Sequence, residues 1–190
     1  ITRKLPVGIQ SVEKLRRDGY IYVDKTAFVW NLVQLSSPYF LSRPRRFGKS
    51  LFLSTLQAYF EGKKELFKGL YIYDKYDFEA FPVIRIVFSG VMSTEESFND
   101  IIKRNMCNNE ENLRCEGNES LSSTERFAAL IKNAAIKYNK PVVILIDEYD
   151  KPILDNITDA PMRSYARDVL KGLYEHIKYN DEYIKFVFLT

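Results

Sequence analysis

The stretch PYFLSRPRRFGKSLFLSTLQAYF, residues 38–60, places a short apolar run, a basic turn and a long apolar segment in direct succession. The first run, residues 38–42, has the aromatic and apolar composition of a strand. The segment 49–60 is apolar on nearly every side, which is typical of a helix packed into the body of a sheet. The turn between them ends in the triplet GKS at 48–50. We therefore predict a strand, a loop and a helix in this order.

A loop that joins a strand to a helix in this way can bind phosphate. Its backbone amides and the positive end of the helix dipole face the anion, and Gly48 lets the backbone approach closely. The lysine of the triplet, Lys49, reaches the β- and γ-phosphates, and the serine, Ser50, ligates Mg²⁺. The predicted nucleotide-binding residues are Arg45, Arg46, Phe47, Gly48, Lys49, Ser50 and Leu51, and the predicted metal ligands are Ser50 and Asp147.

The first glycine of the usual pattern, GxxxxGK[S/T], is absent, because Arg43 stands in its place. Pro44 fixes its own φ and biases Arg43 toward extended geometry, so the chain must leave the strand by another path. Taken alone, the loop fits either a nucleotide site or an ordinary basic loop. The three arginines Arg43, Arg45 and Arg46 either pair with phosphate oxygens, meet DNA or a partner domain, or stay solvated beside acids such as Asp150.

The stretch VVILIDEYD, residues 142–150, is a buried strand that ends in two adjacent acids, the form of a Walker B element. Asp147 is the candidate for holding the Mg²⁺ water shell, and Glu148 is the candidate for orienting the attacking water. Successive side chains point to opposite sides of a strand, so both acids serve one pocket only at its very end. The alternative, a strand that stops at a solvated acidic turn, is disfavoured by the aliphatic residues before the pair.

Apolar strand-like runs alternate with helix-like patterns elsewhere, which indicates a three-layer α/β/α fold with a mostly parallel sheet. Further strands are expected at 82–89, 141–146 and 184–190, and crossover helices at 124–138 and 161–179. The strand succession is typical of nucleoside triphosphatases with an added central strand. In these proteins the strand after the Walker B element often ends in a polar sensor of the γ-phosphate. Thr190 is therefore a candidate catalytic residue, and an ordinary strand-end threonine is the alternative.

Two segments outside these elements have a weaker hydrophobic pattern. The polar run between Arg104 and Ser123 predicts a mobile surface loop. Before the first strand, a short helix that Gly19 can stop precedes YIYVDKTAFVWNLV, residues 20–33, where we expect a short strand and a helix that lie against the core or at the edge of the nucleotide pocket. The YVDKT motif, residues 22–26, either caps the helix at its threonine or packs beside the adenine.

The bulk properties limit the class of protein. The 190 residues fit one domain, and the net charge of +3 from 28 basic and 25 acidic residues is weak evidence for nucleic-acid binding. No apolar run approaches the roughly 18 residues that a membrane span requires, and the N-terminus lacks a signal-peptide pattern. We therefore expect a soluble cytoplasmic protein that does not contact membranes, with nucleic acid as an open partner.

Four stretches, 5–33, 39–70, 142–156 and 186–190, together resemble the predicted AAA-ATPase-like proteins found mainly in bacteria. The octapeptide RPRRFGKS and the heptapeptide IDEYDKP are the most distinctive of the matching motifs. The resemblance implies a P-loop ATPase that uses ATP and Mg²⁺, with the Walker A residues at Lys49 and Ser50 and the Walker B acids at Asp147 and Glu148.

The resemblance also implies an organisation for the whole protein. Residues 1–37 would form an N-terminal segment packed on a P-loop core at 38–190 whose C-terminal part is missing. Full-length members continue into a region that resembles restriction-endonuclease-like nucleases, and self-association is an open expectation. Two alternatives to an ATPase remain at this point: a nucleotide-gated switch with negligible turnover, and a DNA-engaging module of a defence or mobile-element system.

Overall fold

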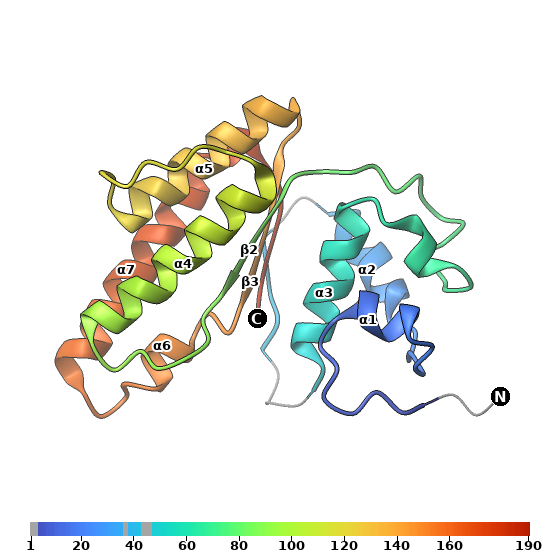
Figure 1. Cartoon of the computed structure of the whole chain (residues 1–190), viewed down its shortest axis with the longest axis horizontal. Coiled ribbons are helices and arrows are strands. Elements are labelled where there is room, and N and C mark those ends of the chain that lie inside the picture. The colour runs from blue at the N-terminus through green and yellow to red at the C-terminus, as the bar shows by residue number, and fades with distance from the viewer. Residues whose placement is uncertain (1–3, 36–37, 43–46) are drawn as a thin grey trace.

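The computed structural model describes residues 4–35, 38–42 and 47–190, and their strands form one parallel sheet (Figure 1). The spatial order of the strands is β1-β4-β3-β2. Their bounds are β1 (Tyr39–Phe40), β2 (Val83–Val87), β3 (Val142–Asp147) and β4 (Ile184–Leu189). The prediction of an α/β fold with a parallel sheet is confirmed, and the last strand in sequence lies inside the sheet between β1 and β3.

Helices cover both faces of the sheet, as the three-layer prediction requires (Figure 1). One face carries α1 (Val12–Arg17), α2 (Thr26–Val33), α3 (Lys49–Phe60) and the 3₁₀ helix η1 (Lys64–Phe67). The other carries α4 (Glu95–Leu113), α5 (Ser123–Tyr138), α6 (Lys151–Leu154), α7 (Ala160–Tyr179) and the 3₁₀ helix η2 (Asp181–Tyr183). None of the helices in the described ranges is long and apolar enough to cross a bilayer.

The strands divide their side chains between two hydrophobic clusters. Alternate residues of β3 pack with the cluster around α4, α5 and α7, whereas Val143 and Leu145 pack with the cluster around α3. Phe186 and Phe188 of β4 join that second cluster too. Because side chains alternate along a strand, the next residue in each series also faces α3. These residues are Asp147 and Thr190, so the alternation aims two polar side chains at the face of the sheet that α3 covers.

The surface loop predicted between Arg104 and Ser123 is wrong over its first half. Helix α4 continues to Leu113, and the irregular segment begins only at Arg114, which adopts a left-handed conformation with φ of 51°. The helix buries a stripe that mixes apolar side chains such as Met106 with polar ones such as Glu110. The polar members interrupt the apolar spacing, which is why the segment looks like a loop in the sequence.

Two asparagines of that stripe serve the open edge of β2. The Oδ1 atom of Asn109 accepts a hydrogen bond from Arg85 N at 2.8 Å, and its Nδ2 donates to Arg85 O at 2.7 Å. Asn105 makes the equivalent pair with Val87 N at 2.9 Å and Val87 O at 3.1 Å. An edge strand normally leaves such groups free to pair with another chain. Here Asn105 and Asn109 of α4 form hydrogen bonds with backbone groups of Arg85 and Val87 that would otherwise be free to pair with a further strand.

We predict that Asn109→Ala lowers the free energy of unfolding by about 1–3 kcal/mol, because the backbone N–H and C=O of Arg85 lose their partner in a buried place. Urea denaturation measures the loss. Asn112→Ala is the matched control, since Asn112 is an exposed residue of the same helix and its replacement should cost less than about 0.5 kcal/mol. Equal losses for the two variants would contradict the edge-satisfying role of Asn109.

Candidate functional site

The candidate site lies where three parallel strands end together. Leu41 N, just after β1, donates to Leu189 O at 2.9 Å, and Thr190 N donates to Ile146 O at 2.9 Å. These bonds hold the carboxyl ends of β1, β4 and β3 side by side. Ligands of open parallel sheets bind outside this edge. The segments that follow β1 and β3 therefore begin at the same edge of the sheet, with only β4 between the two strands.

The first half of the site is the start of α3. Gly48 is the N-cap residue and adopts the left-handed conformation, with φ of 76°. It carries no side chain that could cap the helix, so the amide N–H groups of the first turn are not occupied from the N-cap position. Lys49 and Ser50 form that first turn and are half-buried. The predicted helix bounds of 49–60 are confirmed, and the helix start has the form that phosphate-binding loops use.

The other predicted loop residues differ in their surroundings. Phe47 is 59% exposed, and Leu51 is half-buried against the cluster around α3. Arg45 and Arg46 lie outside the described residues, as do Arg43 and Pro44, so the predicted contacts of these arginines and the path out of β1 remain predictions.

The second half of the site is the carboxylate of Asp147, the last residue of β3, which is only 3% exposed. Its Oδ1 atom accepts a hydrogen bond from Thr190 Oγ1 at 2.8 Å. Its Oδ2 atom lies 3.7 Å from Nη2 of Arg85 on β2. The structure thus brings together the predicted metal ligand at the end of β3 and the predicted sensor residue just after β4.

Glu148 leaves the strand through an uncommon backbone conformation. Its φ is 57°, in the left-handed region that non-glycine residues seldom adopt. Glu148 N donates to Thr190 Oγ1 at 3.3 Å, and Tyr149 N donates to Thr190 O at 2.8 Å, so Thr190 holds the turn from both sides. Strain of this kind persists only where the surroundings enforce it, and it clusters at functional sites. The turn also frees Glu148 from the strand alternation that would aim it away from Asp147.

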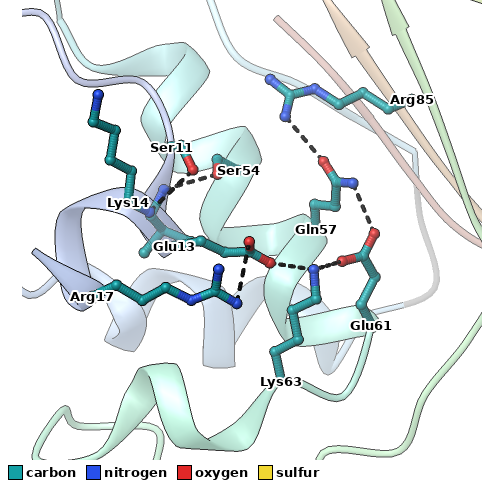
Figure 2. A network of polar contacts seen from close by, with 10 residues as sticks. Ser11, Glu13, Lys14, Arg17, Ser54, Gln57, Glu61, Lys63 and Arg85 are labelled. Atoms are coloured by element: carbon teal, nitrogen blue, oxygen red, sulfur yellow. Dashed lines mark hydrogen bonds and ion pairs between the residues drawn. The ribbon is translucent and has the colours of Figure 1, made fainter.

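Arg85 is the site residue that sequence reasoning missed, although an arginine inside the apolar strand VIRIV was a visible signal. Its Nη1 donates to Gln57 Oε1 at 3.0 Å, and Gln57 Nε2 donates to Glu61 Oε1 at 2.8 Å (Figure 2). Lys63 then bridges Glu61 and Glu13 of α1. Burial lowers the pKa of the Arg85 guanidinium, and the charge of Asp147 opposes that shift. A polar chain therefore runs from the buried acid across α3 to the N-terminal helix.

The oxygen atoms of two described residues, Ser50 and Asp147, are of the chemical kind that Mg²⁺ prefers. Mg²⁺ in such sites takes one or two protein oxygens and fills its remaining positions with phosphate oxygens and water. Ser50 supplies a hydroxyl at the helix start, and Asp147 supplies a carboxylate at the end of β3. Among the described residues, the hydrogen bond to this carboxylate is the one that Thr190 donates to Oδ1, and Nη2 of Arg85 lies 3.7 Å from Oδ2.

We predict that Thr190→Val destabilises the protein by about 1–3 kcal/mol, because the buried carboxylate of Asp147 and the amide of Glu148 both lose the hydroxyl. Valine keeps the shape of the side chain, so the loss reports on hydrogen bonding. Thr190→Ser keeps the hydroxyl and should lose less. Urea denaturation of the three proteins tests this, and a valine variant as stable as the unmodified protein would rule out the proposed support of Asp147.

Comparisons with known proteins bear on the same residues. Residues 6–190 match a protein family described as "Predicted AAA-ATPase". The chain is also 44% identical over 193 residues to a protein of Azotobacter chroococcum mcd 1 described as "Uncharacterized protein in vnfD 5'region". That alignment covers 99% of this chain but 37% of the relative, so the chain spans little more than a third of the relative's length. No solved structure matches the chain.

Proposed function

Because this chain belongs to the predicted AAA-ATPase family, we propose that it binds ATP with Mg²⁺ at the carboxyl edge of its sheet and hydrolyses the nucleotide. The observation that carries the proposal is the placement of two motifs on either side of β4. The GKS triplet opens α3 after β1, and the Asp147–Glu148 pair ends β3. A phosphate-binding helix start and a pair of acids at one edge are the parts that phosphoryl transfer requires.

Nucleotide binding falls to the loop and to the first turn of α3. Lys49 would contact the β- and γ-phosphates, and the amides from Phe47 to Leu51 would donate to phosphate oxygens. Arg45 and Arg46 are the further proposed phosphate contacts. Ser50 and Asp147 would hold the Mg²⁺, which when bound neutralises charge that develops on the phosphates.

Hydrolysis needs a group that orients and polarises water, and Glu148 is the proposed one. Its left-handed backbone turns it out of the buried strand, and its half-buried position keeps it near solvent. Thr190 contacts both Asp147 and the amide of Glu148, so we assign it the positioning of the two acids. A contact from Thr190 to the γ-phosphate itself is the further role expected of a sensor.

Two substitutions separate binding from hydrolysis. Lys49→Ala should weaken Mg·ATP binding by about tenfold to a hundredfold or more, because a charged hydrogen bond to phosphate is lost. Glu148→Gln should keep the affinity for Mg·ATP and lower the turnover by about 10²–10⁴-fold, because the amide does not accept a proton from water. Equilibrium titration measures the first effect, and phosphate release measures the second.

The outcomes have distinct meanings. Unchanged affinity in Lys49→Ala would place the nucleotide elsewhere and overturn the site. ATP binding without phosphate release at any protein concentration would indicate a nucleotide-gated switch. Turnover that rises with protein concentration would indicate that self-association completes the site.

The greater length of the relative extends the proposal. Since the chain covers 37% of its relative, a full-length protein has room for a further region. We propose that the nucleotide state of this site governs that region, for which the family resemblance makes a nuclease the candidate. Binding of the full-length protein to DNA with a steep salt dependence, changed by Mg·ATP, would support the coupling.

A further inference from the structure

The YVDKT motif, residues 22–26, is fixed to the phosphate-loop helix at its first residue. The hydroxyl of Tyr22 lies 3.3 Å from Oγ1 of Thr55, a fully buried residue of α3. Burial raises the pKa of the Tyr22 phenol, so it stays a neutral hydrogen-bonding group. The start of the motif is therefore anchored on the same helix that carries Lys49 and Ser50.

The motif is fixed a second time by Asp24 and Thr26. Asp24 Oδ1 accepts from Thr26 N at 2.8 Å and from Thr26 Oγ1 at 2.6 Å, and its Oδ2 accepts from Tyr71 N at 2.7 Å. Thr26 Oγ1 accepts in turn from Ile72 N at 3.2 Å. Burial raises the pKa of Asp24, but these hydrogen bonds outweigh it and the net shift is downward. Helix α2 begins at Thr26, but the threonine does not cap it: the N-cap residue is Lys25, which makes no side-chain cap bond, and Asp24 accepts the amide of Thr26 instead.

Lys25 lies between Asp24 and Thr26, and its side chain extends toward Gly48. Its Nζ atom lies 3.9 Å from the point that a β-carbon on Gly48 would occupy. The side chain is exposed, and Lys25 takes part in no ion pair between residues within the described ranges. An ammonium group thus stands beside the loop glycine, on a backbone held by hydrogen bonds at the residues before and after it.

We propose that Lys25 is a second phosphate-binding cation, which contacts the phosphate chain of the nucleotide beside Gly48. The inference rests on the proposed nucleotide site and adds to it a residue from a different element, since Lys49 belongs to α3 and Lys25 precedes α2. Ordering a lysine side chain costs up to about 2 kcal/mol of conformational entropy. The fixed backbone of the motif removes the further cost of ordering the main chain, so more of the charge interaction appears as affinity.

The test measures Mg·ATP affinity of the whole chain by calorimetry, and the melting temperature without ligand. Lys25→Ala and Lys25→Gln should each weaken binding by about tenfold or more, as expected for the loss of a charged hydrogen bond. Lys25→Arg should retain most of the affinity because it keeps the charge. Lys132→Ala is the matched control, since it removes an exposed lysine of α5 on the opposite face of the sheet and should bind like the unmodified protein.

The outcomes distinguish the role of Lys25 from the proposed nucleotide site on which it rests. Loss of binding in Lys49→Ala together with Lys25 variants that bind like Lys132→Ala would overturn the role of Lys25 alone. Unchanged binding in Lys49→Ala, or no binding by the unmodified protein, would overturn the nucleotide site as well. A third result would also overturn the inference. If the variants that lose affinity also have a lower ligand-free melting temperature, and Lys25→Arg does not recover the affinity, Lys25 is a structural residue.

Discussion

The carboxylate of Asp147 is buried at the end of an otherwise aliphatic strand, and the rest of the site follows from the need to compensate it. An unpaired buried charge costs several kcal/mol, so partners must approach from neighbouring elements. Thr190 supplies a hydrogen bond from β4, and Arg85 supplies a positive charge from β2. Arg85 in turn needs an acceptor, which it finds in Gln57 of α3. One acid therefore determines polar positions on two strands and one helix.

The same requirement fixes the register of the sheet. The parallel pairing of β3 with β4 places Ile146 opposite Leu189, so the residues that follow, Asp147 and Thr190, meet just beyond the ladder. A shift by one residue would turn Thr190 to the other face and leave the carboxylate without its hydroxyl. The central position of β4 therefore supports Asp147 and Glu148 directly, and it also separates β3 from β1.

The parts of this arrangement that the sequence predicts are those with sharp changes in composition. The apolar run before Asp147 ends at two acids, and the helix 49–60 begins at a glycine and keeps its apolar character to its end, so both elements are recognisable. Helix α4 is not, because Asn105 and Asn109 hydrogen-bond to β2 and Glu110 is buried against Arg126, so polar residues stand where a helix pattern would have apolar ones. The contact between Arg85 and Asp147 depends on strand order, and the left-handed turn at Glu148 depends on Thr190. The arginine within the apolar strand VIRIV is visible in the sequence, but its partner is not, and the turn at Glu148 leaves no local signal.

The N-terminal segment has two connections to the site. The chain of Arg85, Gln57, Glu61, Lys63 and Glu13 reaches α1, and the YVDKT motif reaches the start of α3. The helices that these residues belong to or precede, α1, α2 and α3, lie on the same side of the sheet (Figure 1). The segment is thus part of the structural support of the candidate site, although it precedes β1 in the sequence.

Thermal unfolding in the presence of nucleotide tests the central claim most directly. A ligand that binds only the native state raises its stability by about 2.7 kcal/mol at a concentration one hundred times its Kd. We expect the melting temperature to rise with increasing ATP in the presence of Mg²⁺, and to rise less when a chelator removes the metal. An unchanged melting temperature at millimolar Mg·ATP would contradict a nucleotide site at the carboxyl edge of the sheet.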